Sequence, residues 1–147
     1  MIYVLDTDIL TLLAHDNSPE APRIRRRIAE LSDDELVVTT IINYEEQMRG
    51  WMAALNRARS PRAEVEIYAR LLQYLLSVRR MTVLDYSSAA ATIVAQLRRK
   101  GVSIGAMDLK IAAIVLSVRA VLITRNARDF RKVPDLSIED WSIVTSY

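Results

Sequence analysis

The chain has 147 residues, of which 51% are hydrophobic and 26% charged, a composition typical of a globular protein and not of a disordered one. It contains no cysteine, which excludes disulfide bonds and thiolate zinc sites. Because no signal-peptide pattern and no apolar run of membrane-spanning length is present, we expect a soluble cytoplasmic protein without membrane contact. The length suits a single domain over residues 1–147.

The net charge is only +2, but most of the basic residues are arginines and they are clustered. The clusters are Arg23 to Arg27, Arg57 to Arg62, Arg98-Arg99-Lys100, and Arg125 to Lys132. For any one cluster, a solvated helix face is the simpler interpretation. Arginine side chains also match phosphate geometry, so several such patches around an acidic centre would suit a polyanionic substrate.

Hydrophobic periodicity and turn residues divide the chain into alternating strands and helices. In chain order we expect a strand at residues 2–5, helices at 7–15 and 19–31, a strand at 36–40, helices at 42–57 and 62–78, a strand at 81–84, helices at 88–100 and 105–119, a strand at 120–124, a helical turn at 126–130, and a last edge strand at 141–145. This alternation predicts an α/β fold, a three-layer α/β/α sandwich with a mostly parallel central sheet. Helices 42–57 and 62–78 are expected to form a projecting helical hairpin.

Several residues suggest where these helices begin and end. After a break at residues 16–18, Ser18 is the expected N-cap of the second helix, with Pro19 at its first position. Ser87 or Ser88 should cap the helix that Gly101 ends, and Ser103 is a possible cap of the helix that follows.

Asp6 ends the first expected strand, a short apolar run that should be buried on both faces. In open parallel sheets, ligands bind beyond the carboxyl ends of the strands. A desolvated carboxylate at that place needs a cation or several donors, although Asp6 or Thr7 could simply cap the next helix. Asp8 lies in the first turn of that helix, where the macrodipole favours an anion, so a supporting role in a metal site is its lesser interpretation.

Asp108 shares one helix face with Ile111, Ala112 and Val115, so it is a lone carboxylate on an apolar face. Its place in the first turn explains part of this pattern, and a bound metal ion would explain the rest. Together with Asp6, Glu46 and Asp129, which lie in comparable places, Asp108 suggests a four-carboxylate site. Such a site would bind a divalent metal ion and serve phosphodiester chemistry.

The remaining acidic candidates are less distinct. Glu45 and Glu46 are adjacent and point in different directions, and periodicity does not choose between them. Asp129 follows the strand at 120–124 in a polar segment, where pairing with a neighbouring arginine is the simpler interpretation. His15, the only histidine, falls near a helix end and is interpreted as a C-terminal cap.

The order of these acidic segments along the chain resembles that of a known family. The segments are Asp6-Thr7-Asp8, Glu46-Gln47-Met48-Arg49-Gly50, Gly105-Ala106-Met107-Asp108 with Ile111-Ala112-Ala113, and Leu122 to Phe130 followed by Val133-Pro134 and Glu139-Asp140-Trp141. Together they resemble PIN-domain proteins, and within that family the VapC-type toxins of toxin–antitoxin pairs. The resemblance covers essentially the whole chain, and its last segment is the most specific.

The resemblance implies that the chain is a small α/β/α ribonuclease. Its acidic quartet would be Asp6, Glu46, Asp108 and Asp129, the metal ligands and catalytic residues, with polar support from Thr124, Asn126 and Asp8. Family members use Mg²⁺ or Mn²⁺, form homodimers, cleave RNA and are silenced by an antitoxin encoded beside them. One departure is Gln47, since the family glutamate is usually followed by leucine or isoleucine; Glu45 therefore stays a reserve candidate.

Other classes of protein share part of this pattern. Phosphatases of the haloacid dehalogenase type, which use an aspartate nucleophile, also begin with a strand and Asp-x-Asp, but they need Thr or Val where Leu10 stands and a downstream catalytic lysine. Receiver domains need a lysine after their fifth strand, which this chain lacks. A PIN-like RNA-binding module without catalysis is the non-enzymatic alternative, and the intact acidic quartet argues against it.

Overall fold

The fold is described from a computed structural model that covers residues 1–15 and 17–144. Its five strands are β1 (Ile2–Leu5), β2 (Leu36–Thr40), β3 (Thr82–Leu84), β4 (Val121–Ile123) and β5 (Ser137–Glu139). Within the same residues, its seven helices are α1 (Thr7–Ala14), α2 (Ala21–Ala29), α3 (Ile41–Arg57), α4 (Pro61–Val78), α5 (Ser88–Arg99), α6 (Ala106–Ser117) and α7 (Ala127–Phe130). The predicted alternation of strands and helices is confirmed.

The strands form one sheet in the order β3-β2-β1-β4-β5, and every pairing in it is parallel. Val4 in β1 is in register with Val38 on one side and Leu122 on the other. From β1 the chain builds the sheet outwards to β3, and it then crosses to the other side of β1 to form β4 and β5. This reversal places a topological switch point between β1 and β4, where parallel α/β sheets bind their ligands.

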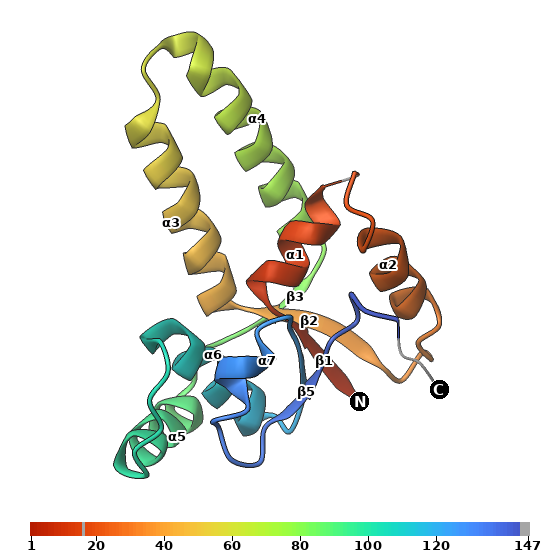
Figure 1. The fold of residues 1–147 in the computed structure, drawn as a ribbon, viewed down its shortest axis with the longest axis vertical. Helices are drawn as coiled ribbons and strands as arrows, with labels where there is room; N and C mark the ends of the chain where they lie inside the picture. Colours follow the sequence, from red (N-terminus) through yellow and green to blue (C-terminus); the bar gives the residue numbers. More distant parts are fainter. Residues whose placement is uncertain (16, 145–147) are drawn as a thin grey trace.

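Alternate residues of β1 face two different hydrophobic clusters, which makes the fold three-layered. Val4 packs with buried residues of α5 and α6, such as Val94 and Ile111. Leu5, which points to the opposite face, packs with Ile9 of α1 and Ile24 of α2. The two helical layers lie on either side of the sheet in Figure 1. The expected α/β/α sandwich is therefore confirmed.

Helices α3 and α4 form a hairpin that extends away from the sheet, as predicted (Figure 1). Ser60 caps α4 by accepting a hydrogen bond from the Ala63 amide, and Pro61 occupies the first helical position. Tyr44 of α3 and Tyr74 of α4 stack with ring centroids 6.0 Å apart. None of the described helices has the length and apolar character required to cross a bilayer.

The expected start of the second helix is wrong. Helix α2 begins at Ala21 with Glu20 as its N-cap residue, and the Ser18 hydroxyl donates to the Glu20 carboxylate at 2.8 Å instead of capping the helix. Pro22 favours this later start, because a proline without an amide proton is best placed in the first turn. Ser103 does not cap α6 either, since Gly105 is its N-cap residue. Asp16, part of the expected break, lies outside the described residues.

The expected last strand at residues 141–145 is also wrong, because the edge strand is β5, which ends at Glu139. The Asp140 carboxylate accepts the Ser142 amide at 2.8 Å, which closes a turn and removes that amide from a strand ladder. Trp141 packs its ring on Tyr3, with centroids 5.1 Å apart. Thr145 lies outside the described residues.

Glu35 joins the turn before β2 to the first strand, and its contribution to stability should depend on pH. Its carboxylate accepts hydrogen bonds from the Ser32 amide and hydroxyl and from the Tyr3 hydroxyl, which lower the pKa of Glu35 to about 2. A folded-state pKa below the ordinary value stabilises the protein above that value, and the contribution is lost as the pH falls towards 2. We expect Glu35→Gln to lower the free energy of unfolding at pH 7.

The measurement is urea unfolding of Glu35→Gln and wild type between pH 7 and pH 3. The difference between them should shrink as the pH falls below the ordinary carboxyl value of 4.5. Glu30→Gln, which alters the exposed carboxyl of the C-cap residue of α2, is the control. A Glu35→Gln difference that stayed constant across this range would contradict the linkage.

Candidate acidic active site

Asp6 lies at the switch point, immediately after β1, and its carboxylate is buried with an exposed fraction of 6%. Its Oδ1 accepts the Thr7 amide at 2.8 Å and the Asn43 Nδ2 at 2.9 Å, and its Oδ2 accepts the Thr124 hydroxyl at 2.7 Å. Burial raises the pKa of Asp6, while these donors partly oppose the rise. Asp6 is thus both the N-cap of α1 and a desolvated carboxylate at the predicted place.

Asn43 connects Asp6 to the start of α3. It is fully buried, accepts the Thr40 hydroxyl at 2.6 Å, and donates to both Asp6 and the Thr7 hydroxyl. Neither Asn43 nor Thr7 was predicted to be a site residue. The available signal was the Thr40-x-x-Asn43 spacing, in which the N-cap of α3 follows a strand end and places Asn43 in the first helical turn.

The structure distinguishes the two adjacent glutamates. Glu46 points into the site, where its carboxylate accepts the Thr7 hydroxyl. Glu45 points outwards and forms an exposed ion pair with Arg49 at 2.7 Å, one helical turn away. Of the two, Glu46 alone therefore belongs to the group of residues around Asp6.

The other predicted residues come from the ends of β4 and α6. Thr124 is buried, and its hydroxyl oxygen accepts the Asn126 amide at 3.0 Å. The Asn126 side-chain nitrogen lies 3.5 Å from Asp108 Oδ2, at the limit of a hydrogen bond. Asp129 stands at the rim, where its carboxylate lies 3.4 Å from the Lys132 ammonium and 3.7 Å from the Arg128 guanidinium.

The carboxylates are close enough to influence one another. Burial raises the pKa of Glu46, and the charges of Asp6 and Asp108 raise it further. Burial, followed by the charges of Asp6 and Asp129, raises the pKa of Asp108. The pKa of Asp129 is instead lowered, first by the Asn126 side chain and then by Lys132 and Arg128. The site therefore concentrates negative charge in its interior and balances it with cations at its rim.

Asp8 belongs to the same charge cluster. One carboxylate oxygen accepts the Arg125 amide at 3.0 Å, while the other is buried and has no hydrogen-bond partner among the described residues. Burial, together with the Asp6 charge, raises the pKa of Asp8 to about 6. The position of Asp8 in the first turn of α1 is as expected. The helix dipole does not, however, account for a buried carboxylate oxygen without a hydrogen-bond partner.

The chemistry of these donors fits a hard divalent cation. Carboxylate oxygens are the ligands that Mg²⁺ and Mn²⁺ prefer, and a cation would relieve the repulsion that raises the pKa values of Glu46 and Asp108. It would also give the unpartnered Asp8 oxygen a nearby positive charge. Across residues 1–15 and 17–144, no three carboxylate or histidine side chains are placed where one ion could bind them all. The donor set therefore fits such an ion by the chemistry and charge of its oxygens, and not by a preformed three-ligand arrangement among the described residues.

The fold and the acidic switch point define a small α/β/α protein with its candidate site at the strand ends. The PIN domain is the family whose model matches this chain, over residues 3–136. The chain belongs to the PIN-domain family.

The relatives of the chain include curated nucleases. It is 34% identical over 142 residues to Ribonuclease VapC1 of Haemophilus influenzae (strain R2866), an alignment that covers 97% of this chain and 99% of that protein. A shorter match, 44% identical over 69 residues, is to the tRNA(fMet)-specific endonuclease VapC of Shigella flexneri and covers 44% of this chain and 52% of that protein.

Solved structures of VapBC proteins share the fold. The structure of VapBC-1 from nontypeable Haemophilus influenzae matches with a TM-score of 0.74 and 32% identity, covering 97% of this chain and 100% of that one. DNA-bound VapBC from Salmonella typhimurium matches with a TM-score of 0.73 and 28% identity, covering 96% of this chain and 98% of that one.

Asn43 should be essential for the stability of the site. Asn43→Ala removes the buried hydrogen bonds to Asp6, Thr7 and Thr40, and we expect it to cost about 3 kcal/mol of unfolding free energy in urea. The matched control is Asn56→Ala, the same change at an exposed position of α3, which should alter stability by less than about 0.5 kcal/mol. Equal effects of the two substitutions would show that the network adds nothing beyond helix propensity.

Proposed function

We propose that this protein is a metal-dependent endoribonuclease and the toxin of a toxin–antitoxin pair, with residues 1–147 forming one nuclease domain that acts in the cytoplasm on RNA. The observation that carries the proposal is the network joining Glu46, Asp6 and Asp108 across the switch point, in a PIN-domain chain. A near full-length relative named as a ribonuclease supports it.

Each site residue has a distinct part in the proposed mechanism. Asp6 and Asp108 would hold the principal Mg²⁺ or Mn²⁺ ion, and Glu46 and Asp129 would orient water or help to hold a second ion. The chemistry that such an ion would supply is neutralisation of charge on the phosphodiester and activation of water for in-line attack. Thr124 and Asn126 fix the orientation of the two aspartates, and Asp8 adds negative charge beside Asp6.

Two protein partners are proposed as well. Solved relatives of similar length are VapBC pairs, which supports a cognate antitoxin for this chain. A basic antitoxin segment would complement the acidic site and block it. The second partner is another copy of the chain, as the resemblance to PIN-domain toxins implies.

The first test is cleavage of a mixed structured RNA by the purified protein, with Mn²⁺ or Mg²⁺ and with EDTA, beside Asp6→Asn. We expect cleavage that requires the metal and that falls at least about 100-fold in Asp6→Asn. Asp33→Asn, which changes an exposed turn residue, should cleave like wild type. RNA that is bound by wild type but never cleaved, over several RNAs, would favour the non-catalytic binding module.

Metal binding is measured separately by calorimetry, so that it does not depend on finding the correct RNA. Asp108→Asn should weaken Mn²⁺ binding at least about tenfold, because it removes one charged ligand. Wild-type affinity in Asp108→Asn would remove Asp108 from the proposed ligand set.

The adjacent glutamates allow a stringent test of the acidic quartet. Glu46→Gln should lower the cleavage rate about 100-fold, because it removes a carboxylate that points into the site. Glu45→Gln has the same chemistry on the neighbouring residue and breaks only a surface ion pair, so its rate should stay within about twofold of wild type. Single-turnover rates on one RNA decide between them, and the reverse order of effects would assign Glu45 to the site.

A further inference from the structure

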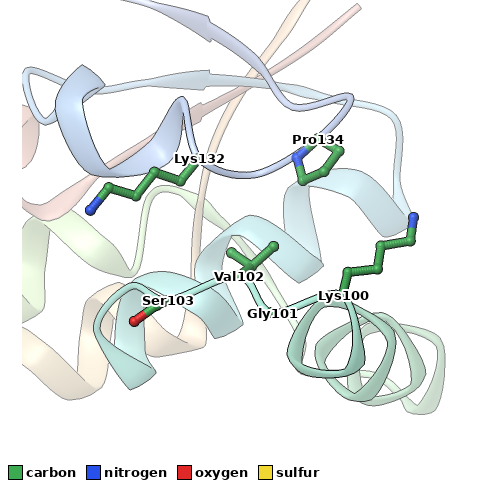
Figure 2. Close-up of a pocket in the computed structure, with 6 residues that line it drawn as sticks. All are labelled: Lys100, Gly101, Val102, Ser103, Lys132 and Pro134. Atoms are coloured by element: carbon green, nitrogen blue, oxygen red, sulfur yellow. The ribbon is translucent and has the colours of Figure 1, made fainter.

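A second feature adjoins the acidic site, a cleft of about 480 Å³ between the loop that joins α5 to α6 and the segment that follows α7. Its lining residues, which Figure 2 shows, are Lys100, Gly101, Val102, Ser103, Lys132 and Pro134. No acidic side chain is among them. The two lysines stand on opposite sides of the cleft, with Val102 between them in this view.

The charge of this cleft is available to a ligand. Lys100 is exposed, and within the described part of the chain no carboxylate lies within ion-pair distance of its ammonium. Lys132 keeps 52% of its side chain exposed, although its ammonium lies 3.4 Å from Asp129. Because the two ammonium groups do not converge, the cleft suits an extended polyanion better than a single small anion.

One contact and one short stretch of the chain connect the cleft to the acidic site. The first is the approach of Lys132 to Asp129 at the rim. The second is the loop before α6: Ser103 lies two residues before Gly105, and Gly105 is close to Asp108, since a methyl group added to it would lie 3.7 Å from Asp108 Oδ2. A strand that crosses Asp108 and Asp129 would therefore enter the cleft next.

We propose that this cleft between Lys100 and Lys132 is a subsite for the RNA backbone, binding phosphates of the strand beside the one at the acidic site. The inference rests on the proposed function and extends it to the path of the substrate. The negative charge of the interior carboxylates repels the RNA backbone. Cations beside them are therefore needed to retain the strand. Lysine contacts to phosphate carry no base information, so the subsite contributes affinity and register and not sequence preference.

The test compares Lys100→Gln with Arg99→Gln, which removes the same charge from the neighbouring exposed residue that does not line the cleft. Both changes are made in a cleavage-deficient Glu46→Gln background. Binding of a fluorescent single-stranded RNA is measured over a range of salt concentrations with Mg²⁺ present. Lys100→Gln should weaken binding about fivefold at low salt and reduce the salt slope by about 0.7, the value for one lost phosphate contact. Arg99→Gln should reduce affinity less than twofold.

A dinucleotide, which has a single internucleotide phosphate to place at the acidic site, should bind both variants equally. Equal affinity of Lys100→Gln and Arg99→Gln for the long RNA, or no binding of RNA by the parent protein, would overturn the subsite. Cleavage by the protein with an intact Glu46 is assayed in parallel. Cleavage together with equal binding of the two variants defeats the subsite alone. Unequal binding without any cleavage defeats the nuclease proposal, and with it the role of the cleft in a substrate path, and leaves only RNA binding at the cleft.

Discussion

Desolvation of one carboxylate, that of Asp6, is the constraint on which the rest of the site depends. A carboxylate with an exposed fraction of 6% needs strong donors, and Asp6 receives them from three separate elements: the start of α1, the first turn of α3 and the end of β4. The same hydrogen bonds therefore tie together the ends of neighbouring parallel strands. Thr7 and Asn43 extend this connection to Glu46, so the hydrogen bonds that join the strand ends also orient the acidic residues.

This arrangement is costly for stability. Raised pKa values at Asp8, Glu46 and Asp108 mean that the folded protein binds protons more tightly there than the unfolded chain, so stability falls as the pH rises through the folded-state values. Carboxylates with pKa values raised in this way are frequent in active sites, where the perturbed ionisation serves the function at a cost in stability. A divalent cation would reverse the sign of the local interaction, since each carboxylate would then face positive charge instead of its neighbours.

Local patterns predicted most of the fold but only part of the site. The strand at residues 2–5 and the helical hairpin followed from periodicity, since their side chains report directly which face is buried. The predictions of the start of α2 and of the last strand were wrong because local side-chain hydrogen bonds intervene: the Ser18 hydroxyl donates to the Glu20 carboxylate, and the Asp140 carboxylate accepts the Ser142 amide. Asn43 was not predicted because its main partner, Asp6, is distant in sequence. Periodicity could not choose between Glu45 and Glu46, and only the hydrogen bond from the Thr7 hydroxyl in the folded structure assigns Glu46 to the site.

The distribution of charge follows from the same constraint. Cations placed among the interior carboxylates would form ion pairs with them and occupy the positions that a metal needs, so positive charge can be useful only at the rim. Lys132 and Arg128 meet Asp129 there, and Asp129 alone among the quartet has a lowered pKa. Lys100 lies further from the acidic residues, on the other side of the cleft. Among the described residues, no carboxylate forms an ion pair with it. Positive charge thus begins where the acidic interior ends, and it favours the approach of a polyanion along that boundary.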